Sequence, residues 1–247
     1  MSAELIMGVN AVITALSAGR RRILELYINP NTKSPALQSA IELTRKMNVP
    51  IVPRSREELT ELLGSESHQG IAIKAHSLPN ANLKDLLTMN AEKSPAPLLI
   101  LEGIEDPHNL GAILRSALAL GSRGVILRER RAVGLTPTTF KVAAGAPEYL
   151  PMCQVANINQ AMKQAKDFGF WIVGLSGKAE ESIVDFRCEY PLVLVLGSEG
   201  EGLSRLVERN CDSLVRIPIN RLMDSLNVSV AAAIALWELG YGRKKVI

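Results

Sequence analysis

The chain contains few cysteines and few aromatic residues, and each shortage excludes a class of protein. Cys153, Cys188 and Cys211 are widely spaced, odd in number and without a CxxC pair, so neither a disulfide framework nor a zinc site is indicated. Aromatic residues make up 4% and hydrophobic residues 47% of the 247 residues. Leu, Ile, Val and Ala must therefore build the core, which is typical of a layered α/β protein.

Long apolar runs and a strong charge of one sign are also missing. No segment approaches about 18 uninterrupted apolar residues, and the first residues lack the basic start of a signal peptide. The net charge is +3, divided into +2 over residues 1–76 and +1 over the remainder, whereas a dedicated polyanion binder usually carries a basic stripe. We expect a cytoplasmic protein with reduced thiols, no metal and no membrane partner.

Helical and strand-like patterns divide the sequence into two alternating α/β blocks. The first block predicts helices over 8–18, 35–47 and 56–63 and strands over 23–28, 49–52 and 70–75. The second predicts strands over 98–101, 124–127, 171–175, 192–196 and 214–217, and helices over 110–120, 138–146, 158–168, 203–208 and 226–239. Its almost continuously apolar strands indicate a parallel sheet covered on both faces. We predict a domain of residues 1–76, a turn-rich linker of residues 77–97 with a short helix near 83–89, and a domain of residues 98–247.

Polar residues follow three predicted strands of the second block. Asn109 opens a helix that also carries Arg115, Glu199 lies in a glycine-rich turn, and Ser225 and Asn227 start the last helix. Each feature alone has an ordinary explanation: a helix cap with a solvated arginine, a strand-to-helix turn with surface acids, and a serine N-cap. Because open α/β sheets bind ligands at the carboxyl ends of their strands, the coincidence of all three favours a site.

The glycine-rich turn Gly197–Gly202 is not a phosphate-binding loop. It lacks the Lys-Ser/Thr ending of a P-loop and does not match GxGxxG. Its carboxylates would repel a phosphate, so it suits a ligand with hydroxyls or positive charge, such as the ribose or sulfonium of S-adenosylmethionine. Because the GxGxxG fingerprint is absent, an enzyme that uses a nicotinamide cofactor is also disfavoured.

Three segments together resemble a known family. DPHNLGAILRSA, LVLGSEGEGLS and IP…SLNVSVAAAIALWE are similar, in order and spacing, to the signature motifs of the SpoU-type RNA 2′-O-ribose methyltransferases of the SPOUT superfamily, over most of residues 98–239. GVNAV and HQGI, within residues 8–76, look like the small ribosomal-protein-like RNA-binding domain that often precedes them. With that domain present, the resemblance is closest to the branch that methylates guanosine in 23S rRNA.

The resemblance implies a fold, a cofactor, partners and a set of site residues. The expected fold is a parallel-sheet α/β domain with a C-terminal trefoil knot, which dimerises and binds S-adenosylmethionine in the knot. The expected partners are RNA, with 23S rRNA ahead of tRNA, and a second copy of the chain. Residues matching the family's cofactor-binding positions are Gly197, Glu199, Gly200, Ile217 and Leu226. Those matching its functional polar positions are Asn109, Arg115, Glu199, Ser225 and Asn227.

Two hypotheses about how the protein contacts RNA concern arginine residues. The resemblance implies that Arg115 is the base, yet a guanidinium is effectively always protonated. We expect Arg115 instead to lower the pKa of the 2′-hydroxyl as a cation, to pair with a neighbouring phosphate, or to do both. Arg20, Arg21 and Arg22 follow the first predicted helix. They are expected to contact RNA phosphates, with a solvated charge run as the alternative.

The chain also departs from the family pattern. Ile219 and Arg221 occupy positions where Met and Gly are usual, and Ala143 stands where Ser is common. Glycine would allow close approach to the cofactor, so Arg221 bears on loop shape and substrate preference. A tRNA ribose methyltransferase, or a non-catalytic RNA-binding ribosome-assembly factor with the same fold, therefore remains an alternative.

Overall fold

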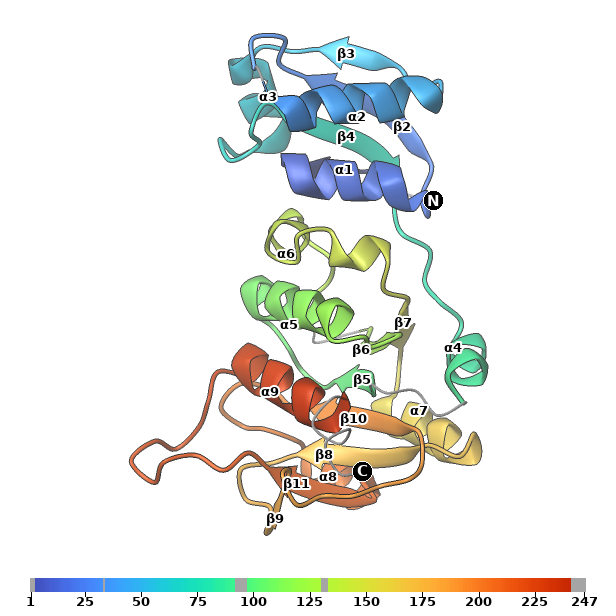
Figure 1. Cartoon of the computed structure of the whole chain (residues 1–247), viewed down its shortest axis with the longest axis vertical. Coiled ribbons are helices and arrows are strands. Elements are labelled where there is room, and N and C mark those ends of the chain that lie inside the picture. Colours follow the sequence, from blue (N-terminus) through green and yellow to red (C-terminus); the bar gives the residue numbers. More distant parts are fainter. Residues whose placement is uncertain (1–2, 33, 92–96, 130–132, 241–247) are drawn as a thin grey trace. The chain divides into compact units, whose positions relative to one another are not determined.

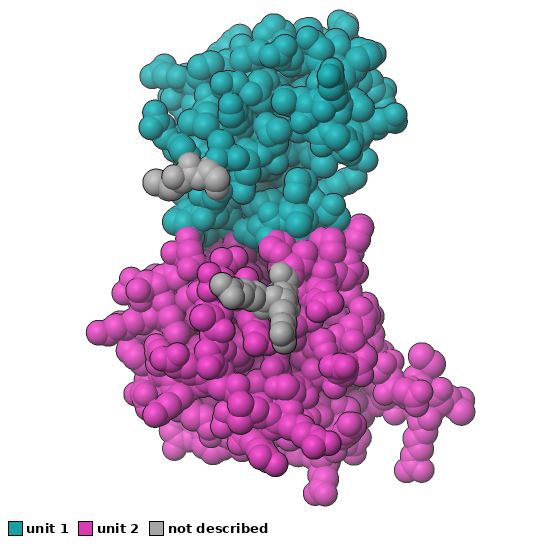
Figure 2. All heavy atoms as spheres, turned by 180° about the vertical axis from the view of Figure 1, so that it is seen from behind, with its two compact units in different colours: residues 1–79, 135–149 teal, residues 80–134, 150–247 magenta. Residues whose placement is uncertain are grey.

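The computed structural model describes residues 3–32, 34–91, 97–129 and 133–240. It divides into two compact units (Figure 2): unit 1 comprises residues 1–79 and 135–149, and unit 2 comprises residues 80–134 and 150–247. The sequence did not predict that residues 135–149 pack with unit 1. The ends of the predicted domains at residues 1–2 and 241–247, and residues 92–96 of the predicted linker, lie outside the described residues.

Unit 1 is an α/β unit built on a mixed sheet in the order β1-β4-β2-β3 (Figure 1). β4 is antiparallel to both β1 and β2, and β3 is parallel to β2. Its elements are β1 Ala3–Met7, α1 Val9–Ala18, β2 Ile23–Ile28, α2 Pro35–Lys46, β3 Ile51–Pro53, α3 Arg56–Leu63, β4 Ile71–His76, α6 Pro137–Val142 and the 3-10 turn η1 Ala146–Glu148.

The alternation of strand side chains places helices on both faces of this sheet. Leu26 and Ile73 pack with α1 and α2, whereas their neighbours Tyr27 and Ala72 pack with Leu59 of α3. This is the period of two that β-strands impose. The predicted helices and strands of the first block are confirmed within two residues at their ends, and β1 is an additional strand that the sequence analysis missed.

The two segments GVNAV and HQGI of unit 1 contact each other in the structure. The backbone N–H of Val9, at the start of α1, donates to Oε1 of Gln69 at 2.9 Å. Nδ1 of His68 accepts from the backbone N–H of Gly70 at 3.0 Å. Burial lowers the pKa of His68, in keeping with a neutral ring that accepts at Nδ1. These residues therefore join the start of α1 to the segment entering β4.

Unit 2 contains a parallel sheet in the order β7-β6-β5-β10-β8-β11-β9 (Figure 1), which confirms the predicted parallel arrangement. Its elements are α4 Leu83–Asn90, β5 Leu98–Leu101, α5 Pro107–Ala119, β6 Val125–Arg128, β7 Met152–Val155, α7 Ile158–Asp167, β8 Trp171–Leu175, β9 Glu181–Ser182, β10 Leu192–Leu196, α8 Arg205–Asn210, β11 Ser213–Arg216 and α9 Val228–Gly240. Every residue of β5 and β10 is buried, because helices cover both faces.

The core of unit 2 explains which helices lie on which face. Side chains of α4, α7 and α8 share one apolar cluster with Leu98, Ile100, Val193 and Val195 of the central strands. α5 and α9 pack against each other (Figure 1).

Among the described residues, no helix is long and apolar enough to cross a membrane.

One predicted helix is wrong in its second half. The pattern predicted helical structure over 138–146, but α6 ends at Val142. Ala144 and Gly145 then adopt positive φ angles of 50° and 83°, which an α-helix does not accommodate. The chain therefore turns before η1 begins.

Candidate active site

The loop after β10 folds back on itself and presents Glu199. Ser198 and Gly202 exchange two backbone hydrogen bonds of 3.0 Å. Gly200 and Gly202 have φ angles of 93° and 73°, a region that favours glycine. A Cβ atom at Gly197 would lie 2.1 Å from the carbonyl carbon of Gly202, so the close return of the chain requires glycine there. The loop that carries the predicted cofactor residues Gly197, Glu199 and Gly200 is therefore a tight turn that depends on its glycines.

Asn109 is held in the first turn of α5. Asp106 caps this helix by accepting from the backbone N–H of His108 at 2.9 Å, and Pro107 occupies the first helical position. Proline is favoured at that position because its missing N–H would be unpaired there anyway. Asn109 itself is 8% exposed. Its amide is therefore fixed by the helix at the end of β5.

Asn227 precedes α9 and caps it. Its side-chain oxygen accepts from the backbone N–H of Ser229 at 2.9 Å and from the hydroxyl of Ser229 at 2.6 Å. Asparagine is among the favoured N-cap residues. The segment between β11 and the last helix therefore delivers an oriented amide to the same edge of the sheet.

The three side chains meet in one hydrogen-bonded group, which we call the Asn-Glu-Asn cluster (Asn109, Glu199 and Asn227). Nδ2 of Asn109 donates to Oε2 of Glu199 at 2.8 Å. Nδ2 of Asn227 donates to Oε1 of Glu199 and to Oδ1 of Asn109, both at 3.0 Å. Two amides thus fix a carboxylate whose charge is available to a cationic ligand.

Other predicted site residues lie near these elements without joining the cluster. Arg115 is exposed on α5, and no hydrogen bond or ion pair of its guanidinium is found among the described residues. Ser225 is exposed just before the cap of α9, and the neighbouring Leu226 is partly buried. Gly200 is in the Glu199 loop, and the partly buried Ile217 directly follows β11. The cluster thus unites three of the five predicted polar residues.

Two of the three residues that depart from the family pattern lie in the segment between β11 and α9, and Ala143 follows α6. Ile219 and Arg221 are both exposed. Asn220 stabilises a turn there, since its side-chain oxygen accepts from the backbone N–H of Leu222 at 2.9 Å and its carbonyl accepts from that of Met223 at 3.0 Å. Arg221 therefore lies on an exposed turn, with its side chain at the surface.

The RNA contact predicted for Arg21 is contradicted. Its side chain is buried, pairs with Glu148 at 2.9 Å and with Glu4, and lies over the ring of Phe140 at 5.1 Å from the ring centroid. Burial raises the pKa of Glu148, and the charge of Arg21 acts in the opposite direction. A guanidinium already paired inside unit 1 is not free for a phosphate.

The other two arginines of the run differ from Arg21. Arg20 is partly buried and donates to the carbonyl oxygens of Pro147 and Glu148, both at 3.3 Å. Burial lowers the pKa of Arg20. Arg22 is exposed. Of the three arginines, Arg22 is therefore the one with an exposed side chain.

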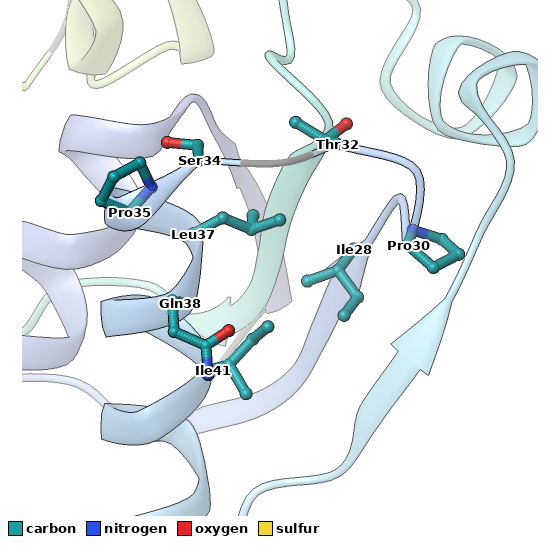
Figure 3. A pocket seen from close by; sticks show the side chains of 8 residues that line it. All are labelled: Ile28, Pro30, Thr32, Ser34, Pro35, Leu37, Gln38 and Ile41. Carbon is teal, nitrogen blue, oxygen red and sulfur yellow. The ribbon is translucent and has the colours of Figure 1, made fainter.

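A cleft of about 540 Å³ lies in unit 1, apart from the unit that contains the cluster. Figure 3 shows Leu37, Gln38 and Ile41 of α2 beside Ile28 at the end of β2. The described residues that line this cleft carry no charge, and we assign it no cofactor. Within the described residues, no group of three or more His, Cys, Asp or Glu could hold a metal ion. None of the three cysteines forms a disulfide.

Comparisons with known proteins match both units. Residues 96–237 match the SpoU rRNA Methylase family, and residues 5–81 match the domain described as RNA 2′-O ribose methyltransferase substrate binding. The chain is 43% identical over 235 residues to the 23S rRNA (guanosine-2′-O-)-methyltransferase RlmB of Coxiella burnetii, covering 95% of this chain and 94% of that protein. It is 38% identical over 236 residues to RlmB of Ralstonia nicotianae, covering 95% and 94%.

A solved structure shares the fold across both units. The SpoU methyltransferase AviRb from Streptomyces viridochromogenes, in complex with AdoMet, superimposes with a TM-score of 0.84 over 98% of this chain and 91% of that one, at 24% identity. At that identity the likeness establishes the fold alone. It agrees with the parallel sheet and the small preceding unit described above.

Proposed function

The chain belongs to the SpoU rRNA methylase family, and from this membership we propose that it transfers a methyl group from S-adenosylmethionine to the ribose 2′-hydroxyl of a guanosine in 23S rRNA. The observation that carries the proposal is the Asn-Glu-Asn cluster, because three segments far apart in the sequence bring its side chains into contact. The relatives named for this reaction match along almost their whole length.

The residues at the carboxyl edge of the sheet suit this cofactor. Glu199 supplies a carboxylate for a sulfonium or ammonium group, and the tight turn from Gly197 to Gly202 leaves backbone groups near it. We propose that Gly197, Gly200, Ile217 and Leu226 hold the cofactor largely through their backbone atoms. When bound, S-adenosylmethionine supplies an activated methyl group.

Arg115 provides the positive charge that the acceptor hydroxyl needs. A ribose hydroxyl is weakly acidic, so it must be aligned and its proton loss eased. As a permanent cation without an ion-pair partner among the described residues, Arg115 can stabilise the developing oxyanion or bind the adjacent phosphate. Ser225, two residues before Asn227, is proposed to contact the same sugar or Arg115.

Arg115→Lys tests whether Arg115 acts through the planar fork of its guanidinium or through its positive charge alone. A lysine keeps the charge but loses the planar fork, so we expect kcat to fall by about 10²-fold, as when one oriented electrostatic donor is lost. Methyl transfer and RNA affinity measured in parallel test this, with Arg123→Lys as the control, since Arg123 is exposed beyond the end of α5. Near-full activity and affinity of Arg115→Lys would exclude any role that needs the fork.

Helix α9 supports a homodimer. Val230 and Ile234 are 47% and 38% exposed, and their spacing of four residues places them on one face of the helix. A helix that is apolar on all sides is usually buried, so this face requires a partner, which we propose is a second copy of the chain. The trefoil knot implied by the resemblance, and a cytoplasmic location where ribosomal RNA is modified, also remain proposals.

Unit 1 is proposed to bind the RNA, with Arg22 as a residue that neutralises a phosphate. Removing one such arginine makes the slope of log affinity against log salt shallower by about 0.7–0.9, and we expect this change in Arg22→Ala. Fluorescence-anisotropy titrations of an rRNA fragment at several salt concentrations measure it, with Arg209→Ala as the control, since Arg209 is exposed on α8 of unit 2. An unchanged slope in Arg22→Ala would rule this role out.

A labelling experiment, together with calorimetry, distinguishes the proposed function from its two alternatives, a tRNA methyltransferase and a non-catalytic assembly factor. The protein is incubated with labelled S-adenosylmethionine and with either 23S rRNA or tRNA, each isolated from a strain that lacks the gene. The proposal predicts label in 23S rRNA alone. Label in tRNA alone would favour the tRNA enzyme, and cofactor binding by calorimetry without any transfer would favour a non-catalytic assembly factor, to which the departure at Arg221 points.

A further inference from the structure

We propose that Ser229 is a positioning residue of the active site, whose hydroxyl adds a second hydrogen bond that holds the oriented Asn227 amide in place. The inference rests on the proposed function, because the group that it orients is part of the proposed cofactor and substrate site. Ser229 is the second residue of α9 and is partly buried. Its place in the helix alone indicates no role, which is why the sequence analysis assigned it none.

Both donors of Ser229 converge on one atom of Asn227. The backbone N–H donates at 2.9 Å and the hydroxyl at 2.6 Å, each to Oδ1. An amide oxygen can accept two hydrogen bonds, whereas an amide nitrogen is a donor. Reversing the amide would therefore place its NH2 group against the backbone N–H of Ser229, which can only donate, whereas the hydroxyl can donate or accept. The oxygen must face Ser229, and the nitrogen must face the cluster.

This orientation passes on to the rest of the cluster. Nδ2 of Asn227 donates to both Glu199 and Oδ1 of Asn109. Because Oδ1 of Asn109 accepts there, its own Nδ2 points to the second oxygen of Glu199, which it contacts at 2.8 Å. Both carboxylate oxygens thus act as acceptors. The first turn of α9 therefore sets the hydrogen-bond direction of all three side chains, and the Ser229 hydroxyl adds a second bond that restrains Asn227.

A purely structural role would be limited to the start of α9. The backbone N–H of Ser229 alone gives Asn227 an ordinary helix-capping bond. Without the hydroxyl, Oδ1 keeps the backbone donor that sets the amide orientation, but the side chain loses the second bond that restrains its position. The two roles therefore differ in their effect on catalysis more than in their effect on folding.

The test uses Ser229→Ala, Ser229→Thr and the full-length protein. We expect Ser229→Ala to lower kcat by about tenfold, the size of one hydrogen bond, with a smaller change in KM for S-adenosylmethionine. Ser229→Thr restores the hydroxyl and should recover most of the rate. Ser55→Ala is the matched control, because it removes a capping hydroxyl from α3 in unit 1 and should leave kcat unchanged.

A double-mutant cycle separates positioning from general damage. In an Asn227→Ala background, Ser229→Ala should cause no further loss of kcat, since its only proposed target is gone. Equal losses in both backgrounds, or full activity of Ser229→Ala, would overturn the inference. Side-chain amide NMR signals of Asn227 give a readout without activity: we expect them to broaden or shift in Ser229→Ala and to return in Ser229→Thr. A wild-type protein without methyl transfer would contradict the proposed function, while these signals would still report on Ser229.

Discussion

Glu199→Ala is expected to lower kcat/KM for methyl transfer by about 10²–10³-fold, the range found when a preorganised electrostatic group is removed from an active site. The change deletes the carboxylate that accepts from both Asn109 and Asn227. Two amides then lose a charged acceptor, and hydrogen bonds to charged groups are stronger than neutral ones. The site also loses the negative charge proposed to face the cofactor. Initial rates at varied cofactor concentration measure the effect.

Glu199→Gln tests the charge at almost constant shape. Its terminal amide offers one acceptor and one donor, so one of the two asparagine amides would meet a donor. We therefore expect a loss close to that of Glu199→Ala. Glu201→Gln is the control, because Glu201 is an exposed acid in the same loop without a hydrogen bond to the cluster. Activity of Glu199→Gln within twofold of the unchanged protein would show that the carboxylate has no role in the reaction.

Gly197→Ala is expected to weaken S-adenosylmethionine binding and catalysis by about 10²-fold, as expected when site groups move by about 1 Å. The new Cβ would lie 2.1 Å and 2.2 Å from the carbonyl carbon and oxygen of Gly202 and 2.4 Å from the backbone nitrogen of Leu203. These are backbone atoms and cannot rotate away. The loop that carries Glu199 must therefore shift.

Calorimetric titration with S-adenosylmethionine checks this second prediction, with circular dichroism to confirm that the variant is folded. Gly177→Ala is the control, because a Cβ there meets no atom within 4 Å. We expect the control to bind the cofactor normally. If Gly197→Ala bound the cofactor as tightly as Gly177→Ala does, the loop after β10 would not form the cofactor site.

The sequence predicted the parallel sheet because apolar strands are a local pattern, and it predicted that the polar residues converge because parallel strands end on the same side. The buried strands β5 and β10 are continuous apolar runs, and the polar residues that follow them lie at one edge, since parallel strands end on the same side. Asn109, Glu199 and Asn227 were identified by that argument and by the family resemblance. The hydrogen bonds that join them confirm that these ends converge.

What the sequence could not predict depends on contacts between distant residues. The run from Arg20 to Arg22 has the pattern of a solvated charge cluster, yet Arg21 is buried by a partner 127 positions away. β7 contains Gln154 and only four residues, so it carries too little pattern for a prediction, and pairing with β6 stabilises it. Ser229 is close in sequence to Asn227, but its role depends on the orientation of an amide, which composition does not encode.

The central claim is that the edge of the parallel sheet holds a methyl donor against an RNA ribose. Mass spectrometry of nucleosides from 23S rRNA, after reaction with S-adenosylmethionine carrying a trideuterated methyl group, tests it most directly. We predict one trideuterated 2′-O-methylguanosine, whose rate of formation falls by about 10²–10³-fold when Glu199→Ala replaces the unchanged protein. Label on a base, or no label in RNA although the cofactor binds, would contradict the account.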